Sequence, residues 1–416
     1  MTASGPSSVN RRSPVRLAYL VSHPIQYQAP LLRRIAREPD IDLTVLFGSD
    51  FSVRGYKDEG FGVEVAWDVP LLEGYRSEFL RPLRDTGAIS PLSPISRGLR
   101  RRLQNPSGSP AFDALWVHGY AGANSLAAIL AANALGIPVL LRAESWLADR
   151  PRSPLKLAAK QLFFSLLRPL IAATLPIGTR NAEYWRFYFG PAMPQFLMPY
   201  AVDNNFFAQR AAAASTQLHK LRAGLQLAPH RPVILFASKL QPRKHADHLL
   251  EAYRRLCAAT PEATRPYLLF VGDGEERSAL ESLAQQHALA GVRFLGFRNQ
   301  SELPGLFSLA DVFVLPSRHE PWGLIVNEAM SAGCAVIVSD EVGSHADLIT
   351  NGVEGFVYPF GDLDALTQSL ANVLREPATA RSMGEAAHRR IAAWSFEADI
   401  QGLRHALAAV TGKLRP

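Results

Sequence analysis

The sequence predicts an α/β protein built from two doubly wound domains, each a parallel β-sheet with helices on both faces. Short β-rich apolar runs alternate with helix-like runs from one end of the chain to the other, a pattern typical of parallel sheets. The series restarts beyond an alanine-rich stretch near the middle, and 416 residues are long for one compact core. Ligands of such sheets bind beyond the carboxyl ends of the strands, so two facing domains would form one central cleft.

The first half of the chain supplies the strands and helices of the first domain. "VRLAYLV" (15–21) is predicted as a buried strand, and "PLLRRIAREP" as the following helix with Pro30 at its first position. "IDLTVLFG" is predicted as the next strand, and "ALWVHGY" and "PVLLRAE" continue the series, each closed by glycine or charge. These elements place the first domain at residues 1–200.

The second half repeats the pattern after a predicted linker at residues 201–225. Its strand-like runs are "RPVILFASK", "RPYLLFVGDG", "VRFLGF", "DVFVLPS" and "AVIVSD". They place the second domain at residues 226–390, and the remaining segment 391–416 is predicted as a helix.

Composition narrows the class of protein. The net charge of +7 favours an anionic partner, which can be phosphate groups of a small ligand, a membrane surface or nucleic acid. The two cysteines, Cys257 and Cys334, form no disulfide framework or metal-spaced set of thiols, so we expect a reducing, cytoplasmic setting. The apolar run 17–21 is too short for a signal-peptide core, and arginine and proline interrupt the longest apolar segment, 161–178. We therefore expect no membrane span.

Two glutamates stand out in the apolar segment "SRHEPWGLIVNEAM". Glu320 precedes a proline and is predicted in the loop after a strand, whereas Glu328 falls in the second turn of a helix that begins near Gly323. Free N–H groups at such a helix start suit a phosphate or a sugar hydroxyl. Eight helical residues would separate the carboxylates by about 12 Å, more than the ~5 to 9.5 Å of glycosidase pairs, which argues against hydrolysis. The alternative is that both are ordinary solvated charges.

The segment containing these glutamates resembles the E-x7-E signature of retaining glycosyltransferases of family 4, which have the GT-B fold. "FASKLQPRKHADHLLEAY" is similar to that family's G-R-L-x4-K-G-x3-L-L-x-A element, with Lys239 at the arginine position and Lys244 at the lysine position. "LLFVGDGEERSALESLA", "VRFLGF" and "NGVEGFVYPFGDLDAL" resemble its further elements. The resemblance covers nearly all of residues 230–400.

The resemblance implies a site for a nucleotide-activated sugar in the second domain. Glu328 would bind ribose hydroxyls, and Glu320 would meet hydroxyls of the transferred sugar. Lys239 and Lys244 would neutralise the leaving diphosphate. His118 resembles a strand-end histidine close to the donor sugar, although a structural histidine is an equal alternative. The implied catalytic residues are Glu320, Lys239, Lys244 and His118, and the implied donor-binding residues are Glu328, Trp322, Gly323, Leu324, Ile325, Gly296, Phe297, Arg298, Ser344 and His345.

Several positions depart from the family pattern. Lys239 offers a point charge in place of the bidentate arginine fork, and His245 stands where a glycine often follows the lysine. "GSHADL", which contains Ser344 and His345, occupies the place of a Gly-rich turn, and "SHPIQYQAP" occupies that of a Gly-Gly loop after the first strand. The acceptor-side candidates in the first domain are His23, Gln26, Arg142 and Glu144; the last two are either acceptor-facing or part of a buried ion pair.

No metal or cofactor is expected. No Asp-x-Asp pair stands at a strand end in a position to clamp a metal on the diphosphate, and no zinc-ligand spacing is found in the sequence. Lysines and helix dipoles would then stabilise the diphosphate, and the nucleotide sugar would be a substrate. The resemblance implies retention of configuration, with the leaving phosphate taking the acceptor proton on the same face. It also implies that the last helix crosses back to the first domain.

The predicted activity is transfer of a hexose-type sugar from a nucleoside diphosphate to a hydroxyl of a glycan, lipid or small metabolite. A nucleotide-sugar epimerase and a non-catalytic GT-B protein that binds nucleotide sugars or glycans are the alternatives. Basic and aromatic residues mix between 156 and 188, which is compatible with peripheral contact to the inner face of a membrane, but a domain helix with a solvated basic edge is favoured. Nucleic acid is not expected as a partner because the basic residues are scattered.

Overall fold

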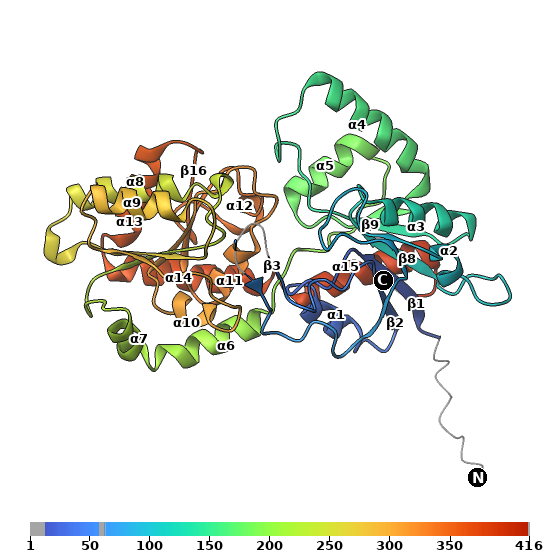
Figure 1. Ribbon diagram of the computed structural model, residues 1–416, viewed down its shortest axis with the longest axis horizontal. Helices are drawn as coiled ribbons and strands as arrows, with labels where there is room; N and C mark the ends of the chain where they lie inside the picture. Colours follow the sequence, from blue (N-terminus) through green and yellow to red (C-terminus); the bar gives the residue numbers. More distant parts are fainter. Residues whose placement is uncertain (1–12, 58–61, 63, 415–416) are drawn as a thin grey trace, which may run out of the picture.

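The computed structural model describes residues 13–414 except 58–61 and 63. Two six-stranded parallel sheets lie in separate lobes, as Figure 1 shows, with strand orders β10-β9-β8-β1-β2-β5 and β13-β12-β11-β14-β15-β16. The first sheet comprises β1 (Val15–Val21), β2 (Ile41–Phe47), β5 (Arg76–Phe79), β8 (Ala114–His118), β9 (Val139–Arg142) and β10 (Ala173–Thr174). The second comprises β11 (Val233–Ala237), β12 (Tyr267–Val271), β13 (Val292–Phe294), β14 (Val312–Leu315), β15 (Ala335–Ser339) and β16 (Gly355–Tyr358). The predicted α/β fold is confirmed.

Helices connect the strands and cover the sheets. In the first half these are α1 (Ala29–Ile35), α2 (Leu99–Arg102), α3 (Ala123–Ala134), α4 (Pro154–Leu167) and α5 (Thr179–Phe189). In the second half they are α6 (Asn204–Ser215), α7 (Leu218–Gly224), α8 (Ala246–Ala258), α9 (Arg277–Gln286), α10 (Leu303–Phe307), α11 (Leu324–Ser331), α12 (His345–Leu348), α13 (Leu363–Leu374), α14 (Pro377–Ala392) and α15 (Phe396–Thr411). Two small hairpins pair β3 (Tyr56–Lys57) with β4 (Glu64–Val65), and β6 (Pro82–Arg84) with β7 (Ile95–Ser96).

Both faces of each sheet are buried, which explains the continuous apolar runs in the sequence. Along β11, Val233 and Leu235 belong to one hydrophobic cluster, whereas Ile234 and Phe236 belong to the cluster on the opposite face. The first sheet is likewise enclosed between two clusters. Because its strands are parallel, their carboxyl ends lie at one edge of the sheet.

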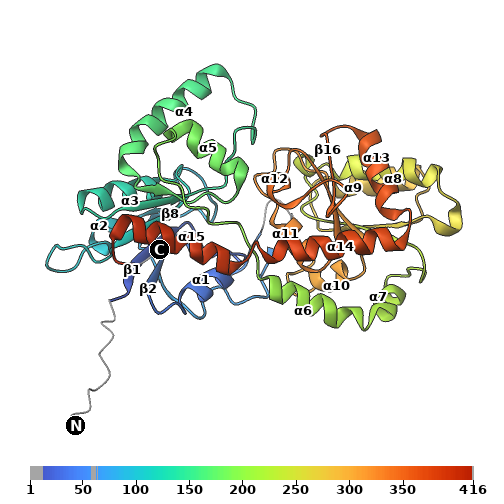
Figure 2. The same ribbon diagram turned by 180° about the vertical axis from the view of Figure 1, so that it is seen from behind.

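The C-terminal helices link the two lobes. Helix α14 contacts β15 and α11 of the second lobe, whereas Ile400, Leu403 and Leu407 of α15 are buried in a cluster with strands β1 and β2. Figure 2 shows α14 on one lobe and α15 on the other. The segment predicted as a linker, residues 201–225, forms α6 and α7, and α6 packs on α10 and α11.

A second connection lies beside the start of α11. The Asp347 carboxylate accepts hydrogen bonds from the Thr179 backbone N–H (2.9 Å) and hydroxyl (2.6 Å) at the start of α5. The Trp322 indole lies so close to Gly178 that a Cβ atom there would stand 2.3 Å from the ring. The loop before α11 is thus held against the first lobe, which fixes its position relative to both sheets.

Among the described residues, no helix is long and apolar enough to cross a membrane. Helix α4 nevertheless exposes several leucines, among them Leu155 (81% exposed), Leu162 and Leu166. Contact of this lobe with a membrane surface and a cytoplasmic location stay predictions.

Candidate active site

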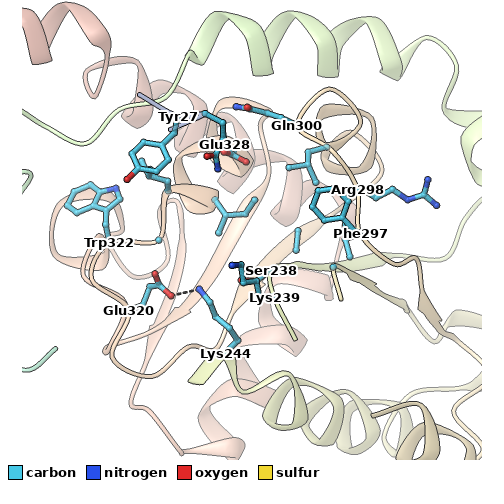
Figure 3. A pocket seen from close by; sticks show the side chains of 18 of the residues that line it. Tyr27, Ser238, Lys239, Lys244, Phe297, Arg298, Gln300, Glu320, Trp322 and Glu328 are labelled. Atoms are coloured by element: carbon cyan, nitrogen blue, oxygen red, sulfur yellow. Dashed lines mark hydrogen bonds and ion pairs between the residues drawn. The ribbon is translucent and has the colours of Figure 1, made fainter. Parts of the chain in front are cut away.

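A cavity of about 400 Å³ lies where the carboxyl ends of the strands of both sheets face each other. Its lining comes from both lobes, and Figure 3 shows a close view. The predicted residues that line it are Glu320, Lys239, Lys244, Glu328, Trp322, Gly323, Leu324, Ile325, Phe297, Arg298, Gln26 and Glu144. The structure thus brings together residues from loops that are far apart in the sequence.

Glu320 lies in the loop between β14 and α11 and is 8% exposed. Its Oε2 accepts hydrogen bonds from Lys244 Nζ and, at 2.9 Å, from Arg243 Nη1. Burial opposes ionisation of this carboxyl, but the charges of Lys244 and Arg243 outweigh it, so the pKa of Glu320 is lowered. The glutamate is therefore an ionised hydrogen-bond acceptor, held in place by two cations.

Lys244 is brought to this position by an unusual backbone turn. It ends the short 3₁₀ helix Pro242–Lys244, and His245 follows with φ of 48° in the left-handed region. This conformation favours glycine, which explains the residue expected there from the family pattern. Lys239, after β11, lines the same cavity, and the neighbouring β12 exit approaches so closely that a Cβ on Gly272 would stand 1.9 Å from the Ser238 carbonyl oxygen.

Glu328 lies in α11 and is 9% exposed. Its Oε2 is buried and has no hydrogen-bond partner among the described residues. Burial raises the pKa of this carboxyl to about 8, because no cation offsets the cost of desolvation. An unpartnered buried oxygen in a cavity suits a ligand that brings hydroxyl groups.

The start of α11 is fixed from behind. Trp322 Nε1 donates to Asn327 Oδ1 (2.9 Å), and Asn327 Nδ2 donates to the Tyr200 carbonyl oxygen (2.9 Å). Gly323, with φ of 85°, begins the helix, and a Cβ there would stand 3.0 Å from the Leu315 side chain. The close packing leaves the first backbone N–H groups of α11 at the cavity wall.

The opposite end of the cavity has its own aromatic side chains, Phe297 and Trp67. Phe297 and Arg298 follow β13, and Gln300 lies beside them with a buried Oε1 that has no partner among the described residues. Figure 3 shows Phe297 and Arg298 on the side away from Glu320 and Trp322, with Lys239 between the two groups. Trp67 reaches this end from the first lobe.

Glu144 stands on the wall formed by the first lobe. Its Oε1 accepts hydrogen bonds from the Tyr27 hydroxyl (3.1 Å) and the Tyr200 hydroxyl, and His118 Nε2 lies 3.6 Å away. Burial opposes ionisation, but His118 and the two hydroxyls lower the pKa of Glu144. Gln26 lines the same wall. The Glu144 carboxylate on this wall is thus an ionised hydrogen-bond acceptor for a molecule that lies against the first lobe.

Six predicted residues do not line the cavity. His118 lies behind Glu144, and His23 stacks on Phe51 with ring centroids 4.6 Å apart. Burial, with a smaller contribution from His118, lowers the pKa of His23 to about 4, so its ring is neutral at pH 7. The others that lie outside the lining are Gly296, Ser344, His345 and Arg142.

Arg142 belongs to a buried ion pair, the second of the two alternatives that the sequence left open. Its side chain is 1% exposed, donates to the Met198 carbonyl oxygen (2.8 Å) and lies 3.5 Å from Asp399 of α15. The expectation that it faces an acceptor is therefore wrong, because its ion pair joins the first sheet to the last helix. Ser344 and His345 turn into the α12 start, where the His345 ring contacts the Val342 carbonyl oxygen at 2.8 Å.

Sequence reasoning missed several lining residues. Arg243, Tyr27, Tyr200, Trp67 and Gln300 line the cavity, and only Arg243 had a signal, its place beside Lys244. A group that can hold a cation was also missed: His245, Asp247 and His248 bring their ligand atoms within 4.8 Å of one another at the start of α8, outside the cavity lining.

Comparison with known proteins finds relatives for the second half of the chain. Residues 219–390 match the model of the family described as glycosyl transferases group 1. Glycogen synthase from Mycobacterium tuberculosis is 31% identical over 159 residues, 38% of this chain and 37% of the relative. A GDP-mannose-dependent monoacylated alpha-(1-6)-phosphatidylinositol monomannoside mannosyltransferase from Corynebacterium glutamicum is 33% identical over 174 residues, 40% of this chain and 44% of the relative. The matched stretch thus spans less than half of either relative.

Solved structures resemble nearly the whole chain. Sucrose-phosphate synthase from Thermosynechococcus elongatus has a TM-score of 0.65 at 20% identity, covering 93% of this chain and 97% of its own. HepE from Anabaena, in complex with UDP and glucose, has a TM-score of 0.68 at 18% identity, covering 95% and 99%. The chain therefore has the GT-B fold, and its second half is related to glycosyl transferases of group 1.

Proposed function

We propose that this chain, whose residues 219–390 match glycosyl transferases of group 1, moves a hexose-type sugar from a nucleoside-diphosphate donor to an acceptor hydroxyl with retention of configuration. One observation carries the proposal. Glu320 and Glu328 line a single cavity, one ionised and paired with cations, the other buried with an unpartnered oxygen. A nucleotide sugar has hydroxyl groups on its sugar and on its ribose, with a diphosphate between them. Two carboxylates and two lysines, Lys239 and Lys244, in one cavity suit these groups.

The donor would lie across the cavity from Glu320 to Phe297. The Glu328 carboxyl would exchange hydrogen bonds with the ribose hydroxyls, and its raised pKa would fall as these donors replace the apolar surroundings. The diphosphate would lie between Lys239, Lys244 and the first N–H groups of α11. Glu320 would accept hydrogen bonds from hydroxyls of the sugar.

The chemical step breaks the bond between the anomeric carbon and the diphosphate oxygen and forms a bond to the acceptor oxygen on the same face. The departing phosphate oxygen takes the proton of the acceptor hydroxyl, so the step balances without a further reagent. Negative charge grows on the diphosphate, where Lys239 and Lys244 stabilise it more than in the ground state. Because these cations and the helix dipole supply the charge, we propose transfer without a metal ion or a cofactor.

The acceptor would enter along the wall of the first lobe. Glu144, held by Tyr27 and Tyr200, would accept a hydrogen bond from an acceptor hydroxyl and orient it. His118 would act through Glu144 as a positioning group. We propose a hydroxyl of a glycan, lipid or small metabolite as the acceptor, and this polar wall supports an acceptor that carries hydroxyl groups.

Purified protein incubated with UDP-, GDP- and ADP-sugars tests the proposal. We expect release of free nucleotide from one of them, and loss of release in Glu320→Ala. Binding of a donor without turnover across a broad acceptor panel would favour the non-catalytic alternative. Conversion of the sugar to its epimer without an acceptor would favour the epimerase.

A further inference from the structure

A short segment of the first lobe is held directly on the second lobe at the aromatic end of the cavity. Asn299 Nδ2 donates to the Ala66 carbonyl oxygen (2.7 Å), and Asn299 Oδ1 accepts from the Asp68 backbone N–H (3.4 Å). The Asp68 carboxylate also accepts from the Ser301 backbone N–H (3.2 Å) and hydroxyl. One amide side chain therefore holds both residues that flank Trp67.

This arrangement presents the Trp67 indole to the cavity. Its ring centroid lies 6.4 Å from that of Phe297, with the rings inclined by 64°, and both side chains belong to the lining. Beside them lies the buried Oε1 of Gln300, which has no partner among the described residues. Two aromatic walls and an unpaired acceptor oxygen together suit a flat ring that carries N–H groups.

The order of groups in the cavity decides which part of a donor meets these walls. In the close view, Glu320 and Lys244 lie at one end, Lys239 lies between them and Phe297, and Glu328 lies toward Gln300 (Figure 3). Under the proposed function these groups bind the sugar, diphosphate and ribose, which leaves the nucleobase for the aromatic end. A base offers a flat ring that can stack on Trp67 or Phe297 and N–H groups that can donate to Gln300 Oε1.

We propose that Trp67 covers the nucleobase of the donor and that Asn299 is the positioning residue that places it there. The inference rests on the proposed function. Since Trp67 belongs to the first lobe and Asn299 to the second, the stack is complete only when the lobes are in contact at this edge. Donor binding and the contact between Ala66–Asp68 and the second lobe therefore stabilise each other.

Equilibrium binding of UDP, GDP and ADP to the full chain tests the inference. We expect Trp67→Ala to weaken the tightest of these by about tenfold, the range of base–aromatic stacking, and Trp67→Phe to recover most of the loss. Asn299→Ala should raise the donor KM several-fold with kcat at saturating donor little changed. Adding Asn299→Ala to Trp67→Ala should raise the donor KM little further, because the two residues act as one unit.

The affinity for inorganic pyrophosphate distinguishes loss of base stacking from general damage to the donor site. Pyrophosphate has no base, so Trp67→Ala should leave its affinity unchanged, measured as competition with the bound nucleotide. Phe187→Ala, which removes an exposed ring of α5, serves as the matched control and should behave as wild type.

The binding data distinguish failure of this inference from failure of the proposed function. If Trp67→Ala binds all three nucleotides as tightly as wild type while Glu328→Ala binds them weakly, the inference is wrong and the proposed function stands. Equal weakening of nucleotide and pyrophosphate binding would also overturn it. If the wild type binds no nucleotide, the proposed function itself fails.

Discussion

Replacing Glu328 by glutamine should stabilise the ligand-free protein at alkaline pH and weaken donor binding. The pKa of Glu328 is raised from 4.5 to about 8 by burial. The folded protein therefore binds a proton that the unfolded chain has lost between these values, and the free energy of unfolding falls as the pH rises through this window. Glutamine mimics the protonated acid and carries no such dependence.

The size of the effect follows from the same pKa values. Each pH unit between 4.5 and 8 lowers the free energy of unfolding by about 1.4 kcal/mol, so the loss reaches about 5 kcal/mol above pH 8. This is an upper limit, since water in the open cavity screens the charge. Glu328→Gln should thus match wild type near pH 4.5 and become progressively more stable than wild type up to pH 8.

Urea unfolding of wild type and Glu328→Gln at pH 5, 6, 7, 8 and 9 measures this difference. We expect the difference in free energy of unfolding between the two proteins to widen with pH and to level off above pH 8. A gap that is constant across the series would refute the claim that this carboxyl is buried without a compensating cation. Binding of UDP, GDP and ADP by the same variants should show the opposite order, with glutamine weaker because it accepts fewer hydrogen bonds from ribose.

Three further substitutions test the rest of the cavity. Lys244→Ala should lower kcat/KM at least about a hundredfold, and an unchanged kcat/KM would contradict its role at the diphosphate. The same change removes one of the two cations that pair with Glu320 and should lower the free energy of unfolding by about 3 kcal/mol; Arg243, which remains beside Glu320, limits the loss. Asp347→Ala removes both hydrogen bonds from Thr179 and should lower the free energy of unfolding by about 2 kcal/mol, measured from the thermal midpoint. An unchanged midpoint would mean that this contact does not stabilise the fold. Glu144→Gln should raise the acceptor KM and leave the donor KM unchanged; the reverse pattern would move Glu144 to the donor side.

The fold was largely predictable because both faces of each sheet are buried. Strands such as β11 and β14 are continuous apolar runs, which a sequence reveals directly. The edge strand β5, "RSEF", was not predicted, because its half-exposed and polar residues show no apolar period. Its place beside β2 is set by tertiary pairing.

The site was predictable where motif and strand end coincide, as for Glu320, Glu328, Lys239 and Lys244. Position at a strand end does not fix side-chain direction, so His118 lies behind Glu144 and outside the lining. Contacts between remote segments left no local signal in the sequence.

Trp67 shows this limit most clearly. It lies in a segment without apolar period, and its orientation depends on Asn299, which is more than two hundred residues away in the chain. Tyr27 and Tyr200 likewise meet at Glu144 only in the folded chain.

The configuration of the first-formed product shows whether the enzyme transfers the sugar with retention. Time-resolved proton NMR should follow the anomeric centre when the wild type consumes the nucleotide sugar that it accepts. We predict a product with the configuration of the donor, released together with nucleoside diphosphate, and no product from Glu320→Ala. An inverted product, or undiminished turnover by Glu320→Ala, would contradict this prediction.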